Sequence, residues 1–393
     1  MFSFLRNAPT RKLVLAALAV LGLLATVTAI AVAANSNSAK PPAKPLSSAV
    51  HDALSAPRVQ GVTARISFTN RLIESSSIQA GSTPLLSGAS GRLWASDDGR
   101  IRLELQSEQG DVEVLSDGKT LTVYDATRNT LYKVALPQRV ADHTPSSGVP
   151  TIATIEKTLG QLGADANISG ATPSNVAGRE AYTVQVSPKH DGGLLGSVQL
   201  AWDASNGTPL RVAVYAAGSS SPVLELKATE ISFGAVASSV YAIAPPASAE
   251  VINLTSPVGQ SADERHGSQP TVSGASAVQK ELAFPLADPA TLDGLPQQEV
   301  RLASVNSSKA ALVTYGKGLG GIAVLEQPAK KSSGNSSGKD ITGSLPAVSI
   351  DGTTGHELAT ALGTVLTFDR AGVSYTVIGS IPPAAAEAAA RGL

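Results

Sequence analysis

The chain has 393 residues, and its 30 Lys and Arg are balanced by 31 Asp and Glu, which gives a formal net charge of -1. A nearly neutral chain has no general positive field to attract nucleic acid, so we expect no DNA or RNA partner. Cysteine is absent, which excludes disulfides, cysteine nucleophiles, zinc–thiolate sites and a lipid-modified cysteine anchor. The length exceeds that of one typical domain and predicts two.

The first element along the chain is an apolar segment that predicts a membrane anchor. Residues 1–12 contain three basic residues, and residues 13–34 then contain no charge and no proline. Such a run can cross a bilayer as a helix, and the preceding positive charge keeps that side in the cytoplasm. We expect a single-pass protein of the cell membrane with most of the chain extracytoplasmic. The small residues 31–33 resemble a signal-peptidase site, so secretion after cleavage is the alternative.

Composition divides the rest of the chain into two domains. Residues 35–45 are rich in Ser, Lys and Pro and form a spacer. The first domain is predicted over residues 46–255. A segment rich in Ser and Gly, residues 256–276, is interpreted as a linker, and a smaller α+β domain follows over residues 277–393.

The first domain is organised around residues 90–137, where short strand patterns follow one another. Ile101, Leu103 and Leu105 alternate with charged residues, which places three aliphatic side chains on one face of a strand. Asp-Gly turns, such as Asp117-Gly118, separate the strands. This pattern predicts an antiparallel meander with one apolar face.

The flanking patterns add helices and further strands. Residues 48–56 and 151–162 have apolar residues at helical spacing. Residues 62–70 and several runs within 180–233 alternate as strands do. The fold class that we expect is α+β: a curved antiparallel sheet of about ten strands, forming an unclosed half-barrel, with both helices on its concave side.

Several stretches of this domain resemble the LolA lipoprotein-carrier and RseB regulator superfamily, which is found outside the bacterial cytoplasm. The stretches are SDGK (116–119), VYD (123–125), VAGREAY (176–182), VSPK (186–189), WD (202–203), GTPLR (207–211) and PP (245–246). The resemblance implies a half-barrel whose helices cover an apolar cavity that holds acyl chains. A membrane anchor departs from the soluble carriers of the family.

Ten apolar residues on the predicted strands are the candidate lining of such a cavity. They are Leu103, Leu105, Val112, Val114, Val184, Val186, Leu200, Trp202, Val212 and Leu226. Alternating apolar residues occur equally in a sheet that carries a packed core, so the pattern alone does not distinguish a cavity from a core.

The C-terminal domain shows strand patterns but no catalytic signature. The predicted strands are 299–305, 310–315, 322–325, 348–350, 365–368 and 375–378, with a helix over 384–391. Stretches near residues 315–318, 363–366 and 372–375 resemble a small α+β module of unknown function that accompanies extracytoplasmic bacterial proteins. Residues 316–321 match GxGxxG, but a strand follows them instead of a helix, so we interpret them as a glycine hairpin.

No pattern in the sequence predicts an enzyme, a metal site or a cofactor. His356-Glu357 begins like a zinc-protease motif, but Thr360 stands where the second histidine would be. The resemblance to the LolA and RseB superfamily implies a binding protein for a lipid or for the acyl chain of a lipoprotein, and the apolar N-terminal segment would hold it at the membrane. The alternative is a sensor or regulator of the RseB kind, which binds an anti-sigma factor or another envelope or signalling protein.

Overall fold

The computed structural model describes residues 39–73, 84–136, 149–189, 193–242, 245–254, 272–305, 308–329 and 345–393. The predicted anchor, residues 13–34, lies outside these ranges, as does most of the predicted linker. Among the described residues, no helix has both the length and the apolar character that crossing a membrane requires.

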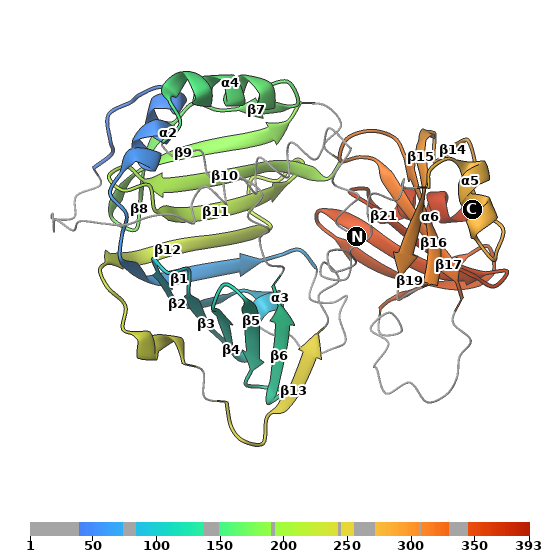
Figure 1. Cartoon of the computed structure of the whole chain (residues 1–393), viewed down its shortest axis with the longest axis horizontal. Helices are drawn as coiled ribbons and strands as arrows, with labels where there is room; N and C mark the ends of the chain where they lie inside the picture. Colours follow the sequence, from blue (N-terminus) through green and yellow to red (C-terminus); the bar gives the residue numbers. More distant parts are fainter. Residues whose placement is uncertain are drawn as a thin grey trace.

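A sheet of 13 strands forms the first part of the chain (Figure 1). Its strands run in the order β13-β6-β5-β4-β3-β2-β1-β12-β11-β10-β9-β7, and β8 pairs with β9 next to β7. The bounds are β1 Gly61–Asn70, β2 Ala89–Ser96, β3 Ile101–Ser107, β4 Gly110–Ser116, β5 Thr120–Asp125, β6 Thr130–Ala135, β7 Ala166–Ile168, β8 Thr172–Val176, β9 Arg179–Pro188, β10 Leu195–Asp203, β11 Pro209–Ala216, β12 Leu224–Phe233 and β13 Glu250–Leu254.

The expected curved sheet is present, but it is larger than expected. Figure 1 shows it curling from β9–β12 at the top towards β3–β6 at the bottom. The predicted meander forms β2 to β6. The prediction of about ten strands was wrong because β7, β8 and β13 are too short to show a clear alternation. β13 also pairs in parallel with β6, whereas the other ladders between described strands of this sheet are antiparallel.

Two of the helices in this part were predicted, and their positions differ from the expectation. α2 (Leu46–Ser55) packs on one end of the sheet, over β9 and β10, with Ile168 of β7 and Val212 of β11 at the border of the contact. α4 (Ile152–Leu162) lies against α2, where Ser47 Oγ donates to Glu156 Oε1 at 3.1 Å. A four-residue helix that the sequence did not reveal, α3 (Pro84–Ser87), packs near β1, β3 and β4. The two predicted helices therefore cover one end of the sheet and not its whole concave side.

A second sheet of eight strands forms the C-terminal part, in the order β14-β15-β16-β17-β21-β20-β19-β18. The bounds are β14 Thr291–Leu292, β15 Leu295–Val305, β16 Ser308–Tyr315, β17 Ile322–Pro328, β18 Ala347–Ile350, β19 Thr353–Thr360, β20 Gly363–Arg370 and β21 Val373–Gly379. The predicted terminal helix is present as α6 (Pro383–Arg391), and it packs on this sheet. α5 (Ala275–Glu281) was not predicted and begins within the last residues of the predicted linker.

Two sequence motifs of this part lie on or between strands. Residues 316–321 connect β16 to the antiparallel β17, so the glycine hairpin is confirmed. His356 and Glu357 lie on β19, a strand, and so cannot belong to the helix of a zinc protease.

Candidate functional site

The ten predicted residues share one face of the 13-stranded sheet. Paired residues of neighbouring strands point to the same side, so the register can be followed across the sheet. Leu105 pairs with Val112 and, through β2 and β1, is connected by the register to Leu226. From Leu226 the pairs continue through Val212 to the residues of β10 and β9. We call this surface, which carries all ten residues, the inner face.

The inner face is packed at some positions and partly open at others. Five of the ten residues are buried: Leu105, Val112, Val184, Leu200 and Trp202. The remaining five are half-buried: Leu103, Val114, Val186, Val212 and Leu226. The inner face thus combines a core with surface that the described residues leave partly accessible.

The buried side chains form two separate clusters on this face. One lies beneath α2, where Ala49 packs among Tyr182, Val184, Leu200 and Trp202. The other surrounds Ile66 and Leu105 and is bordered by Leu85 of α3. Val114 and Val186 belong to neither cluster. The two clusters do not merge, because α2 reaches only one end of the curved sheet.

The cluster beneath α2 is tied to the residues that lead into this helix. Tyr182 Oη donates to the carbonyl oxygen of Pro42 at 2.7 Å, and the rings of Tyr182 and Trp202 lie 6.2 Å apart. Lys44 Nζ lies 5.3 Å from the centre of the Tyr182 ring and 2.6 Å from Asp52 Oδ2. Residues 39–45 therefore belong structurally to the first sheet.

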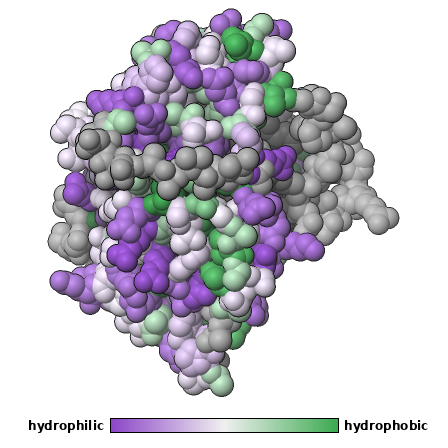
Figure 2. Space-filling model, turned by 90° about the vertical axis from the view of Figure 1, so that its left-hand side faces the viewer, coloured by the Kyte–Doolittle hydropathy of each residue, from purple (hydrophilic) through white to green (hydrophobic). Residues whose placement is uncertain are grey.

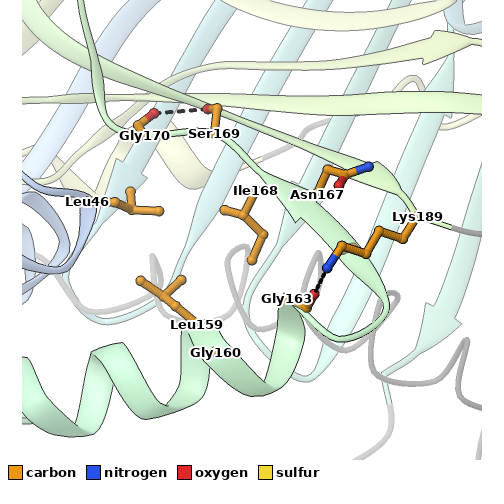
Figure 3. Close-up of a pocket in the computed structure, with 10 residues that line it drawn as sticks. Leu46, Leu159, Gly160, Gly163, Asn167, Ile168, Ser169, Gly170 and Lys189 are labelled. Carbon is orange, nitrogen blue, oxygen red and sulfur yellow. Dashed lines mark hydrogen bonds between the residues drawn. The ribbon is translucent and has the colours of Figure 1, made fainter.

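A groove opens between α4, the start of α2 and the edge strand β7. Its volume is about 540 Å³. Figure 3 shows Leu46, Leu159 and Ile168 extending towards one another across it. The lining residues are Leu46, Leu159, Gly160, Gly163, Ala166, Asn167, Ile168, Ser169, Gly170 and Lys189. We call this space the edge groove. Its size is in the range of sites that hold small organic ligands.

One wall of the edge groove is closed by a lysine at the end of α4. Lys189 Nζ donates to the carbonyl oxygen of Gly163, which caps α4 (Figure 3). A cation at a helix C-terminus compensates the partial negative charge of the last carbonyl groups. Gly160 of α4 also lines the groove and leaves space there, because a Cβ atom added to it would have no neighbour within 4 Å.

The edge groove and the inner face are continuous through Ile168 and Leu46. Both side chains line the groove and also pack against the cluster beneath α2. None of the ten predicted residues lines the groove. Leu159 had been recognised only as part of an amphipathic helix, and β7, which carries Ile168, has three residues and gives no strand signal of its own.

The opposite face of the sheet is polar. A smaller hollow of about 360 Å³ is lined there by Trp94, Arg65, Arg92 and Glu230, among others. Arg65 Nε lies 3.2 Å from Glu230 Oε2, and Arg102 pairs with both Glu104 and Glu113. These charges are balanced across neighbouring strands, which is typical of a solvated sheet surface.

Figure 2 shows one side of the molecule, on which hydrophobic residues lie in small groups among hydrophilic ones. This view offers no broad apolar surface for a partner. Partly accessible apolar side chains are found on the inner face, such as Val186, and in the edge groove, such as Leu159.

Potential metal ligands do not gather at one place among the described residues. In this part of the chain, no group of three or more His, Asp or Glu side chains could hold a metal ion. His51 Nδ1 and His356 Nδ1 each lie within hydrogen-bonding distance of a backbone carbonyl oxygen, those of Pro150 and Leu345. Leu46, Leu159 and Ile168 give the edge groove its apolar lining.

No family model and no curated protein matches the chain. Among solved structures, MucB in complex with MucA(peri) is 18% identical, with 88% of this chain and 97% of that chain covered and a TM-score of 0.41. MucB alone is 18% identical over 88% and 96% of the two chains, with a TM-score of 0.36. An uncharacterized conserved protein from Thermus thermophilus is 11% identical over 50% and 91%, with a TM-score of 0.32.

Proposed function

We propose that the chain is a membrane-anchored, extracytoplasmic protein that binds acyl chains of a lipid or a lipoprotein. The observation that carries this proposal is the continuity between the edge groove and the inner face. Ile168 and Leu46 line the groove and also border the cluster beneath α2. A hydrocarbon chain that entered the groove would thus meet apolar side chains along its path.

Apolar contact alone can supply the binding energy for such a ligand. Transfer of one methylene from water to an apolar site contributes about 0.8 kcal/mol. Burial of roughly eight to ten carbons would therefore give micromolar binding before the cost of ordering is subtracted. No specific polar group is needed, which explains why no motif in the sequence marks the site.

The proposed anchor would hold this site near its source of lipid. Residues 39–45, the end of the predicted spacer, lead into α2. Tyr182 Oη donates a hydrogen bond to the carbonyl oxygen of Pro42 in this segment. The segment that follows residues 13–34 is thus attached to the strand that carries Val184 and Val186. In this proposal the protein performs no chemical step and uses no metal or cofactor.

Native mass spectrometry of a soluble form is the direct test. Residues 39–393 retain the contact between Tyr182 and Pro42 and omit the predicted anchor. After mild extraction, we expect a fraction of the protein to carry lipid, and the bound mass identifies the lipid. A preparation that is free of lipid, even after incubation with vesicles made from envelope lipids, would refute the acyl-chain proposal.

Gly160 provides a variant pair for the same measurement. Gly160→Trp places an indole in the edge groove, whereas Gly160→Ala leaves the groove open. Both changes remove a helix-interior glycine and should leave α4 intact. We expect lipid loading to be lost in the tryptophan variant alone. Equal loading of both variants would exclude the edge groove as the site.

A regulator that binds an envelope or signalling protein is the second candidate, and the edge strand β13 favours it. Val251 on this strand is 51% exposed, and β13 pairs with β6 on one side only. An exposed edge strand can accept a strand from another chain. If the protein carries no lipid and retains a membrane-protein partner that requires residues 277–393, the regulator proposal replaces the lipid proposal.

A further inference from the structure

A glutamate is completely buried in the centre of the C-terminal sheet. Glu326 lies on β17 between Ala311 of β16 and Tyr375 of β21, and its exposed fraction is 0%. The flanking inward residues of β17, Ile322 and Val324, belong to the apolar core. Glu326 follows them in the strand alternation, so its carboxyl group points into the same apolar layer.

The carboxyl group of Glu326 holds a segment that crosses this core. The segment, residues 283–290, connects α5 to β14, and we call it the strap. The backbone N–H of Ala287 donates to Glu326 Oε2 at 2.9 Å. Phe284 of the strap is buried in the core of the sheet.

Side-chain amides fix the strap on both sides of Ala287. Gln279 Nε2 donates to the carbonyl oxygen of Phe284 at 3.0 Å, and Gln279 Oε1 accepts from the Leu286 N–H at 2.8 Å. Gln297 Nε2 donates to the carbonyl oxygen of Asp288 at 3.1 Å. These amides do not ionise, so Glu326 is the titratable contact among those that fasten the strap.

The groups that face Glu326 do not compensate a negative charge. Asp288 of the strap is acidic, and Tyr315 of β16 and Tyr375 of β21 are neutral phenols near pH 7. The positive charge of Arg370 interacts electrostatically with the Tyr375 hydroxyl, and its guanidinium forms an ion pair with Asp351. Glu326 forms no ion pair with any described residue, and neither its Oε1 nor the Tyr315 hydroxyl has a hydrogen-bond partner there.

We propose that Glu326 is a proton-operated latch for the strap, which stays closed while the carboxyl group is neutral and opens when it ionises. A neutral carboxyl is tolerated in an apolar layer with one hydrogen bond, whereas an unpaired carboxylate there is strongly disfavoured. Opening of residues 283–290 lets water reach the carboxylate and exposes part of the apolar layer that Phe284 covers. The C-terminal sheet would thus present more apolar surface above neutral pH than below it.

The pH at which the latch operates follows from its surroundings. Burial raises the pKa of the Glu326 carboxyl from 4.5 to about 7, the Ala287 N–H opposes this rise, and the charge of Asp288 adds to it. The strap is therefore closed in mildly acidic solution and opens as the pH rises through neutrality. The direction of this pH response is opposite to that of a histidine switch, which opens on acidification.

Amide hydrogen exchange of the full chain, followed by mass spectrometry, tests the latch. The probe is the peptide that covers the strap, and its protection is compared between about pH 5 and about pH 9 after correction for intrinsic exchange. In the unchanged protein we expect protection to fall by up to about tenfold per pH unit between about pH 4.5 and about pH 7, and to stay constant above that. Glu326→Gln keeps an acceptor for the Ala287 N–H but cannot ionise, so its strap should stay protected throughout.

Two further variants keep the test decisive. Glu357→Gln removes another buried carboxyl of the same sheet. Glu357 lies on β19, pairs with Leu366 and has Glu387 as its charged neighbour, so the strap of this variant should respond to pH like that of the unchanged protein. Asp288→Asn removes an exposed like charge and should move the transition to lower pH even if Glu326→Gln does not fold. A strap whose protection is independent of pH in the unchanged protein, or equally dependent on it in Glu326→Gln, would overturn the proposal.

Discussion

The backbone N–H of Leu194 donates a hydrogen bond to the carbonyl oxygen of Ser380 at 3.0 Å, and the same nitrogen lies 3.0 Å from Ser380 Oγ. A second backbone hydrogen bond, from the Ala361 N–H to the Leu72 carbonyl oxygen, measures 2.7 Å. The turn between β9 and β10 is thereby joined to the residue that follows β21. The first bond connects the strand pair beneath α2 to the C-terminal sheet, and the second connects the end of β1 to the turn between β19 and β20.

The first prediction concerns Gly193 at this junction. Gly193 has a φ of +56°, and an added Cβ atom would lie 2.2 Å from the Ser380 carbonyl oxygen. Gly193→Ala should therefore break the bond between Leu194 and Ser380 and lower the free energy of unfolding by roughly 1–3 kcal/mol. Urea unfolding and hydrogen exchange at Leu194 provide the measurements.

Gly218 is the matched control for Gly193. It also has a positive φ, +75°, but an added Cβ atom would have no neighbour within 4 Å. Gly218→Ala should show only the cost of the backbone conformation, about 1 kcal/mol. If both variants lose the same stability and Leu194 remains protected in Gly193→Ala, the contact with Ser380 is not important for joining the two sheets.

The second prediction compares two residues of β9 that both point to the inner face. Val184 is buried beneath α2, whereas Val186 is half-buried and lies outside both clusters. Val184→Arg buries a charge without a partner and should destabilise the fold by more than about 4 kcal/mol. Val186→Arg can extend its guanidinium to water and should cost about 1 kcal/mol.

Circular dichroism and the lipid content of the purified variants measure this pair. We expect Val186→Arg to remain folded and to lose lipid if the inner face is part of the binding surface. A folded Val186→Arg that retains its full lipid content would restrict the ligand to the edge groove. A fully folded Val184→Arg would contradict the packing described beneath α2.

The third prediction concerns a buried carboxylate near the turn between β10 and β11. Asp203 is 1% exposed and accepts from Arg179 Nε at 2.7 Å, as well as from the Ser205 N–H at 2.8 Å. Arg179→Ala leaves the carboxylate with fewer partners and should cost about 2 kcal/mol. The midpoint of urea unfolding reports this loss.

Arg65 serves as the control for Arg179. Its pair with Glu230 is exposed on both sides, so Arg65→Ala should change the free energy of unfolding by less than about 0.5 kcal/mol. An effect of Arg179→Ala that is as small as this would indicate that the amide and hydroxyl donors of Ser205 suffice for Asp203.

The fourth prediction is the pH dependence of global stability caused by Glu326. Because burial raises the pKa of this carboxyl above its ordinary value, the folded state binds the proton more tightly than the unfolded state. The stabilisation is therefore complete below about pH 4.5 and is lost as the pH rises towards 7, with a total of roughly 3 kcal/mol.

The difference between the unchanged protein and Glu326→Gln isolates this contribution. Denaturant unfolding at a series of pH values should show that the two curves diverge between these limits and run parallel above neutral pH. A constant difference across the whole range would mean that Glu326 keeps the same charge in the folded and unfolded states.

The local patterns of the sequence were sufficient for the strands that alternate over five or more residues. The meander β2 to β6 follows from the alternation around Leu103 and from Asp-Gly turns, because both signals are local. The inner-face assignment of all ten residues followed for the same reason. Whether those residues bind lipid stays a prediction.

Features that depend on tertiary contact were not predictable from these patterns. The edge groove requires β7, a three-residue strand that exists because β9 offers it a partner. The restriction of α2 to one end of the inner face depends on the curvature of the sheet. Glu326 was missed because the predicted strand ended at Leu325, although Ile322 and Val324 already indicated that position 326 points inward.

The parallel strand β13 has a consequence for the order of assembly. Residues 130–134 of β6 pair with residues 250–254, and β1 pairs with β12 at residues 224–233. Both partners are synthesised later than the strands they pair with. During synthesis, the hairpins from β2 to β6 emerge well before these partners. If the ribosome pauses before residue 224, the nascent chain holds a partly formed sheet whose two edge strands have no partner. Aggregation and binding by chaperones are therefore most favoured at this stage.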